Sequence, residues 1–419
     1  MKDLPPLDNL GYLRTQYLEK LWPLVTTHSL AKVIVGQRRS GKSTILKQLL
    51  SRILAEEIVT PDQVVYINFE LPKWQHVVHA TQLFDIIEAF IKPLPSDKEF
   101  FLVLDEIQEV EGWEKVVSGY LAESRRCHIF ITGSNSKLLS SELATYLTGR
   151  YIEIEIHPLS YEEFLGFTKA SRHKDSFIQY LSSSGIPELY HLPNQQEIQF
   201  SFLSSLKDSI VMKDIVRRYA IKTPHVLDLI FSFLIDNIGN LFSVPSLVNK
   251  LKSIGISTNV VTLAHYLNYL EYAYLIFGVH RYDMKGKRIL EGEKKYYLND
   301  LGFRNYFSSQ FDPGLTKNLE NYVFNTLKLC GYTVYVGRIG DLEIDFVAEK
   351  DRKRRYFQVT YLLSTEKVVE REYGNLMKCK DQWPKAVISL DDLPLPVNEG
   401  IHHIRAWEFE ALLKNQSPF

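Results

Sequence analysis

The sequence predicts an α/β protein that opens with a parallel β-sheet and continues into further domains. Short apolar runs at 31–35, 64–69, 101–104 and 128–132 alternate with helical patterns, which is typical of a parallel sheet with helices on both faces. At 419 residues the chain is too long for one hydrophobic core and indicates roughly two to four domains. Its composition, 45% hydrophobic and 24% charged, is that of a globular protein.

Charge and cysteine content narrow the class of protein. The formal net charge is -1 and the pI is about 6.9, so no global basic field indicates nucleic-acid binding. Three cysteines (Cys127, Cys330 and Cys379) stand too far apart for a CxxC pair, which fits a reducing compartment. The sequence has neither an apolar signal segment nor 18 consecutive apolar residues. We therefore expect a cytoplasmic protein without a membrane partner.

The strand predicted at 31–35 leads directly into a glycine-rich loop, GQRRSGKST, and then into a helical pattern that starts near Ile45. Residues 36–43 match the phosphate-binding pattern G-x-x-x-x-G-K-[ST] at every position. The strand–loop–helix context is what separates this motif from a chance match. A glycine-rich turn without a ligand is the alternative interpretation.

Each residue type in the loop has a physical reason to be there. Gly36 and Gly41 permit positive φ and close backbone approach, and the following helix directs its positive end at the phosphates. Lys42 is expected to reach the β- and γ-phosphates, and the Ser43 hydroxyl to hold Mg²⁺. We thus predict ATP and Mg²⁺ as ligands, with a nucleotide-binding set of Gly36, Arg39, Ser40, Gly41, Lys42, Ser43 and Thr44.

An apolar strand at 100–106, FFLVLDE, delivers two acids to its carboxyl end, where parallel sheets bind ligands. Asp105 is expected to hold Mg²⁺ with Ser43, directly or through water. Glu106 is placed to orient or deprotonate the attacking water. The alternative is that both acids are simply exposed to solvent at the end of a strand.

Two further segments offer catalytic candidates. The strand IFITGSNS (129–136) ends in polar groups; Asn135 is the first choice for a contact with the γ-phosphate or water, with Thr132 and Ser134 behind it. The segment LTGRY offers Arg150 as an arginine finger that acts on a neighbouring subunit's nucleotide. A polar turn and a structural arginine are the respective alternatives.

Beyond residue 157 the pattern changes from alternating strands and helices to mostly helices. Residues 243–307 are similar to a winged helix-turn-helix, with two helices followed by a hairpin. From residue 314 a helix leads into three strands, another helix and a strand at KAVISL. We expect this last strand to close the unit.

In this order the motifs resemble those of AAA+ ATPases, and specifically a bacterial and archaeal branch with a C-terminal domain of unknown function. The resemblance spans about residues 15–415 and implies an ATPase core at 1–157, a helical lid at 158–225, a winged-helix-like domain at 226–308 and a C-terminal domain at 314–419. It also implies the finger role of Arg150. The segments that carry it are GQRRSGKST, VLDEIQEV, ITGSNSKLL, LTGRYIEIEIHPLSYEEF, SGIPE, KKYYLNDLGFR, EIDFV and REYGNL.

The C-terminal hundred residues resemble the PD-(D/E)xK (restriction-endonuclease-like) nuclease fold. Glu320 matches the helix acid of that active site, and Asp345 matches the strand acid. The third motif departs from the pattern, because Gln358 replaces the acid and Thr360 replaces the lysine. Since neither replacement supplies the missing charge, we expect a degenerate site with little or no nuclease activity.

Contacts with DNA are ambiguous from sequence. The basic segment KDRKRR (350–355) falls between two predicted strands, so a solvated hairpin tip competes with contact to a DNA backbone. The expected recognition helix, TNVVTLAHYLNYLEYAY, holds almost no Lys or Arg, which favours a packing role over DNA binding.

Three functions follow. The preferred one is an ATPase that hydrolyses ATP and moves its C-terminal domains, with Lys42, Glu106, Asn135 and Arg150 in the catalytic set. The second is a slow or partner-triggered ATP switch or DNA-binding module, and the third is an ATP-coupled nuclease. A trans-acting Arg150 would require a homo-oligomer. The client, whether DNA, protein or neither, is not specified by the sequence.

Overall fold

The computed structural model describes residues 7–8, 10–95, 98–123, 127–135, 146–147, 149–310, 314–393 and 395–415. The chain divides into two compact units, Met1–His157 with Tyr272–Tyr274 and Pro158–Glu271 with Leu275–Phe419. Across the described ranges, no helix combines the length and apolar character that crossing a membrane requires.

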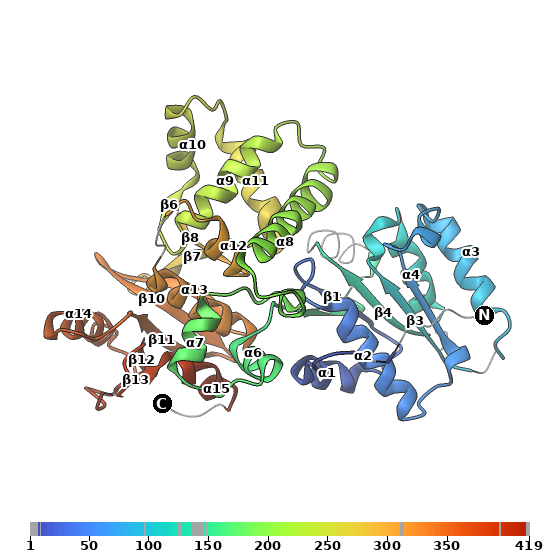
Figure 1. Cartoon of the computed structure of the whole chain (residues 1–419), viewed down its shortest axis with the longest axis horizontal. Helices are drawn as coiled ribbons and strands as arrows, with labels where there is room; N and C mark the ends of the chain where they lie inside the picture. Colours follow the sequence, from blue (N-terminus) through green and yellow to red (C-terminus); the bar gives the residue numbers. More distant parts are fainter. Residues whose placement is uncertain are drawn as a thin grey trace. The chain divides into compact units, whose positions relative to one another are not determined.

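The first unit is built on a five-stranded parallel sheet in the order β2-β3-β4-β1-β5 (Figure 1). Its central strands are buried along their whole length, which is why they read as continuous apolar runs. The strands predicted in this region are confirmed, and the alternating run YIEIEI forms the edge strand, as expected. The strands are β1 (Ala31–Val35), β2 (Val64–Asn68), β3 (Phe100–Asp105), β4 (Cys127–Gly133) and β5 (Tyr151–Glu155).

Helices cover both faces of this sheet. Helices α1 (Thr15–Leu21) and α2 (Lys42–Ala55) lie on one side, and α3 (Ala80–Ile91) and α4 (Trp113–Ala122) lie on the other (Figure 1). The buried face of α2 repeats at helical spacing through Ile45, Leu49 and Ile53. Because β1, β3 and β4 are neighbours and run parallel, their carboxyl ends meet at one edge, where α2 begins.

The second unit starts with helices. A capping box between Ser160 and Glu163 starts the first of them, since each side chain binds the other residue's backbone N–H. A π-helical segment, Ile210–Arg217, extends the third. The helices are α6 (Tyr161–Thr168), α7 (Lys174–Leu181), α8 (Gln196–Ser209) and α9 (Pro224–Asp236).

The two helices and the hairpin predicted within 243–307 are present. They are α10 (Val244–Ser253), α11 (Val260–Tyr272), β7 (Ile276–Asp283) and β8 (Arg288–Leu298), with the short strand β6 (Phe242–Ser243) before them and α12 (Gly302–Phe307) after. The sequence assigned this hairpin and the C-terminal strands to different domains. In the structure they share one eight-stranded sheet, β13-β12-β11-β10-β9-β7-β8-β6.

The C-terminal part of this mixed sheet has a helix on each face. On one face α13 contributes Leu319 and Phe324 to a core with Phe346 and Phe357. On the other face Leu376 of α14 packs in a core with Val347 and Tyr356. The elements are α13 (Leu315–Leu329), β9 (Thr333–Ile339), β10 (Leu342–Lys350), β11 (Lys353–Val359), α14 (Glu366–Met377), β12 (Lys385–Ser389), β13 (Ile401–Arg405) and α15 (Phe409–Lys414).

Two expectations about this region were wrong. The strand at KAVISL does not close the unit, because β13 pairs parallel to β12 and α15 follows. The segment IHHIR was overlooked because two adjacent histidines interrupt its apolar pattern. The segment RYFQVTYLL, which has the apolar character of a strand up to Leu363, is also shorter in the structure, because β11 ends at Val359, the last residue of its ladder with β12.

Asp300 joins two sequence segments that carried the family resemblance. It lies just after β8 and accepts hydrogen bonds from Ser184 Oγ (2.7 Å), Gly185 N (2.6 Å) and Gly302 N (2.9 Å). Gly302 has no room for a side chain, since a Cβ there would lie 2.4 Å from Ser184 Cβ. The SGIPE and LNDLGF segments therefore form one hydrogen-bonded junction inside the second unit.

Replacing Asp300 with Ala is expected to lower the free energy of unfolding by roughly 2–4 kcal/mol, because two buried N–H groups lose their acceptor. Burial raises the pKa of Asp300 from 3.8 to about 6. Because the pKa of Asp300 is higher in the folded chain than in the unfolded chain, its contribution to stability is complete at pH values below the unfolded-state pKa. This contribution is lost as the pH rises through the folded-state pKa. The wild-type advantage over D300A should thus be larger near pH 4 than near pH 7 in urea denaturation.

The exposed Asp341 provides a control, and D341A should change stability by less than about 0.5 kcal/mol. Equal D300A and wild-type stabilities at both pH values would contradict the structural role of Asp300.

Candidate active site

The loop between β1 and α2 has the backbone shape of an anion-binding nest. Gly36 has φ 142°, and a Cβ at this residue would lie 2.2 Å from Ile156 O, so no side chain fits. Gly41 (φ 98°) and Arg39 (φ 67°) also take positive φ. Such alternation directs successive N–H groups to one side, and α2 adds its N-terminal end at Lys42. The predicted strand–loop–helix context is confirmed.

Lys42 is buried within this loop. Its Nζ donates to Gly36 O (3.1 Å) and Gln37 O (3.2 Å) and lies 3.5 Å from Glu106 Oε1. Its ammonium is therefore positioned at the inner side of the loop, directly beside Glu106, the residue that follows β3. Arg39 and Thr44 are exposed at the loop and the first turn of α2.

Two buried side chains of the loop have polar atoms without a hydrogen-bond partner in the described part of the chain. They are the Ser40 hydroxyl and the Gln37 amide, and both residues are fully buried. Since buried polar groups are normally hydrogen-bonded, the loop is chemically suited to a polar ligand.

Asp105 lies at the end of β3 and receives four side-chain hydrogen bonds. Ser43 Oγ (3.0 Å) and Thr132 Oγ1 (2.5 Å) donate to Oδ1, whereas Tyr66 OH (2.7 Å) and Asn68 Nδ2 (3.0 Å) donate to Oδ2. The predicted pair Ser43 and Asp105 is thus assembled. Tyr66 and Asn68 were not predicted; the signal was available, because residues two apart on a strand share a face.

The two adjacent acids have different electrostatic environments. Burial, followed by the nearby charge of Glu106, raises the pKa of Asp105. Burial also disfavours the ionised form of Glu106, but the Lys42 ammonium and a hydrogen bond from Gln108 outweigh it and lower the pKa of Glu106. Glu106 is therefore the stronger acid of the pair, whereas ionised Asp105 calls for a compensating cation.

Glu106 also has a strained backbone. It adopts φ 56°, uncommon for a residue with a side chain, and its N–H donates to Thr132 Oγ1 at 2.9 Å. Thr132 consequently holds both acids, and this contact gives a physical role to a residue that ranked behind Asn135 in the prediction. Asn135 is buried two residues beyond β4, and its contact with a phosphate or water stays a prediction.

Arg150 lies away from this loop. Its carbonyl accepts the N–H of Ala31, the first residue of β1, whereas Gly36 follows the last residue of that strand. At about 3.3 Å per residue, the intervening strand measures roughly 16 Å. The Arg150 backbone thus lies at the amino-terminal end of β1, whereas its own phosphate loop lies at the carboxyl end of that strand.

The donor set fits a magnesium ion with few protein ligands. No group of three or more His, Cys, Asp or Glu side chains within the described ranges is arranged to hold a metal. Mg²⁺ typically takes one or two protein oxygens and fills its other positions with water and substrate phosphates. One hydroxyl and one carboxylate oxygen 3.0 Å apart, those of Ser43 and Asp105, match this requirement.

The C-terminal acids predicted as a vestigial nuclease site lie in a second polar cluster. Glu320 accepts hydrogen bonds from Lys295 Nζ (3.0 Å) and Tyr297 OH (2.7 Å), and Lys295 also pairs with Glu343 at 2.8 Å. Burial and, after it, the charge of Glu320 raise the pKa of Asp345. Glu320 and Asp345 therefore interact electrostatically, and their assignment to a vestigial nuclease site stays a prediction.

Gln358 has a structural role in this cluster. Asp345 occupies a bulge of β10, and the Gln358 carbonyl oxygen accepts its N–H at 2.9 Å. The Gln358 amide nitrogen donates to Glu372 at 2.9 Å. Since Lys295 is bonded between two acids and both ends of Gln358 are engaged, the donor set does not fit a divalent metal.

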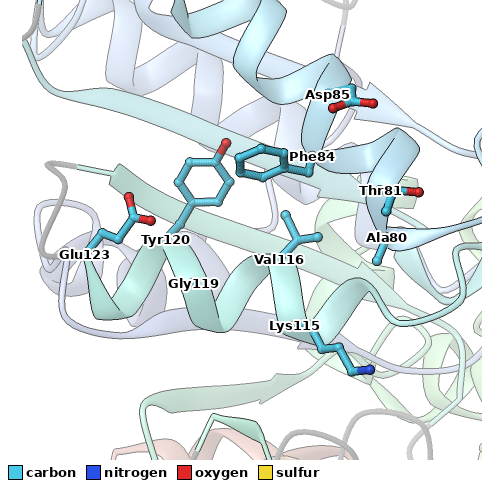
Figure 2. A pocket seen from close by; sticks show the side chains of 9 residues that line it. All are labelled: Ala80, Thr81, Phe84, Asp85, Lys115, Val116, Gly119, Tyr120 and Glu123. Atoms are coloured by element: carbon cyan, nitrogen blue, oxygen red, sulfur yellow. The ribbon is translucent and has the colours of Figure 1, made fainter.

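A groove of about 320 Å³ lies between α3 and α4 of the first unit, outside both clusters (Figure 2). The rings of Phe84 and Tyr120 lie next to each other in its lining, with centroids 6.2 Å apart. Its lining is mostly apolar and contains no residue of the phosphate loop, Asp105 or Glu106. We therefore assign the active site to the loop and not to this groove.

Replacing Thr132 with Val removes the hydroxyl that donates to Asp105 and accepts from Glu106 N. Because both partners are buried, T132V should lower the free energy of unfolding by roughly 1–3 kcal/mol. T132S retains the hydroxyl and should lose distinctly less. Chemical denaturation measures both, and equal losses for Val and Ser would attribute the effect to packing.

Comparisons with known proteins identify the type of domain in the first part of the chain. Residues 28–165 match the model of the AAA domain, and residues 174–314 match that of a domain of unknown function (DUF8612). The structure is similar to the Walker-type ATPase of Pyrococcus abyssi, with a TM-score of 0.46 and 15% identity over 71% of this chain and 95% of that one. AMPPCP-bound DnaA from Aquifex aeolicus gives a TM-score of 0.30 at 12% identity, over 64% of this chain and 92% of that one.

Sequence relatives cover nearly the whole chain. An uncharacterized protein of Haemophilus influenzae is 36% identical over 90% of this chain and 92% of its own length. One from Methanocaldococcus jannaschii is 31% identical over 91% of this chain and 86% of its own length. The chain therefore belongs to the same family as these bacterial and archaeal proteins, and its residues 28–165 form an AAA domain.

Proposed function

We propose that this protein binds ATP with Mg²⁺, hydrolyses it, and uses the cycle to move domains of its second unit. One observation carries the proposal: the carboxylate of Asp105 bonds the first hydroxyl of α2 while Glu106 lies beside Lys42. Four predicted site residues from two distant segments thus converge at the glycine-rich loop. Fold similarity alone would not assign an activity.

The chemistry of each group supports phosphoryl transfer to water. The loop amides and Lys42 are suited to hold the triphosphate, and Ser43 and Asp105 to hold Mg²⁺, which neutralises charge on the phosphates when bound. Glu106, with its lowered pKa, is ionised near neutral pH and can accept a proton from the attacking water. Asn135 is proposed to orient that water.

The Glu106→Gln variant tests this assignment. Removing the proton acceptor should slow ATP hydrolysis by about 10²–10⁴-fold. Binding of Mg·ATP should persist, because Lys42 and the loop amides are intact. Steady-state phosphate release and titration calorimetry measure the two quantities.

Glu109 offers a matched control, since it is an exposed glutamate three residues along the same turn. E109Q should hydrolyse ATP like the wild type. Unchanged turnover in E106Q would remove Glu106 from the proposed role, and absence of ATP binding by the wild type would reject the function altogether.

We further propose that Arg150 acts in trans, within a homo-oligomer. The Arg150 backbone lies at the amino-terminal end of β1, and its own phosphate loop lies at the other end of this strand. This separation favours a contact of Arg150 with the nucleotide of a neighbouring subunit. A structural arginine at the start of β5 is the alternative, and a switch with slow intrinsic hydrolysis would follow from it.

A trans-acting arginine makes the ATPase rate per subunit rise with protein concentration. R150A should lower the rate about 10³-fold or more. Mixing R150A with E106Q should restore activity, because one subunit supplies the arginine and the other an intact site. A rate independent of concentration, together with an active R150A, would identify a structural arginine.

The client and location are also proposals. The basic hairpin tip is formed by Lys350 and Lys353 around a two-residue turn, and Arg354 next to it pairs with Glu349. This internal pairing favours a solvated hairpin over DNA contact. The Lys295 bridge likewise favours a nuclease-like domain without nuclease activity. We retain the winged-helix interpretation, an unspecified DNA or protein client, and a cytosolic location.

A further inference from the structure

A buried arginine just before α1 bonds to the back of the phosphate loop. Arg14 is 4% exposed, and its Nη1 donates to Ser40 O at 2.7 Å. The Arg14 backbone N–H is also bonded, to Gln48 Oε1 of α2 at 3.4 Å. Burying a charged guanidinium costs free energy unless its N–H groups are hydrogen-bonded. The bonds of Arg14 offset this cost and fix the position of its side chain.

The contact with Ser40 O has a geometric consequence for the ligand side of the loop. The peptide that carries this carbonyl also carries the N–H of Gly41, and no cis peptide occurs in the described chain. In a planar trans peptide the C=O and N–H point in opposite directions. Arg14 therefore turns the Gly41 N–H away from itself, and its positive charge polarises the same peptide.

The second arm of the guanidinium reaches the end of the first unit. Nη2 donates to His157 O at 2.9 Å. The ring of Tyr17 lies beneath the guanidinium, and its OH accepts the His157 N–H at 3.1 Å. The preceding residue, Ile156, donates its N–H to Val35 O at 2.7 Å and places its carbonyl against Gly36. The loop and residues 156–157 are thus one hydrogen-bonded structure, from which the chain continues into the second unit.

We propose that Arg14 is a positioning residue with two roles: it orients the Ser40–Gly41 peptide toward the triphosphate, and it transmits the position of that peptide to His157. The proposal rests on ATP binding at this loop. Any displacement of Ser40 O on binding changes its bond to a guanidinium that also holds His157 O. The segment at 156–157 is then the place where nucleotide occupancy is sensed by the rest of the chain.

Two variants and one control test the positioning role. R14M should weaken Mg·ATP binding by about tenfold or more and raise KM accordingly, because the loop amide loses its orientation. R14K should recover only part of the affinity, since a single ammonium cannot bond both carbonyls in the planar fork geometry. R52M is the matched control: Arg52 stacks on Trp22 at 3.8 Å and pairs with Glu19 of α1, but bonds neither the loop nor His157.

Hydrogen exchange tests transmission without relying on the variant's stability. In the full-length wild type, Mg·ATP should change exchange at the His157 amide, and this change should be lost in R14M and kept in R52M. If the wild type does not bind ATP, the proposed function fails. If it binds ATP but His157 exchange is unaffected, or R14M binds ATP as well as R52M does, the inference about Arg14 is overturned.

Discussion

The buried carboxylate of Asp105 is the interaction on which the first unit depends. A desolvated acid costs several kcal/mol unless its oxygens are bonded, and here the donors come from the first turn of α2, from β2 and from β4. Meeting that requirement aligns three neighbouring elements with the end of β3. The same alignment brings the Ser43 hydroxyl and the Asp105 carboxylate next to the glycine-rich loop. These groups are chemically suited to a divalent cation, and the loop amides are suited to phosphates. The same hydrogen bonds therefore stabilise this end of the sheet and assemble the site.

Both units place a buried lysine beside acids, but the arrangements have different chemical consequences. Lys42 lies beside Glu106, whereas the side chains that bond Asp105 in the described part of the chain are neutral hydroxyl and amide groups, so a cation remains favourable at Asp105. Lys295 instead lies within 3.0 Å of Glu320 and within 2.8 Å of Glu343, and it supplies the compensating charge internally. This lysine comes from β8 and not from the strand where the nuclease pattern has one. The two clusters thus support opposite conclusions about metal binding despite similar residue composition.

Much of the first unit was predictable because its strands are buried on both faces. Such strands read as continuous apolar runs, and β1, β2, β3 and β4 were found within one or two residues of their predicted ends. The second unit was harder, since its sheet collects strands that are distant in sequence. Pairing of β7 with β9 joins the hairpin to the C-terminal strands, and β13 is a half-buried strand with two polar histidines. Neither feature has a local signal, because pairing partners are chosen by the complete fold.

Local sequence patterns were sufficient to predict the loop, its lysine and serine, and the acid pair at the end of β3, because each has a fixed local spacing that the chemistry of phosphate binding requires. The folded chain was needed to show which donors surround Asp105 and that Thr132 holds both acids. It was also needed to show that Arg14 bonds Ser40 and His157 across 26 and 143 residues of sequence. The fold likewise places Lys295 of β8 beside Glu320 of α13 and Glu343 of β10. Hydrogen bonds between distant segments depend on where the packed chain places buried polar atoms, and no local pattern encodes that placement.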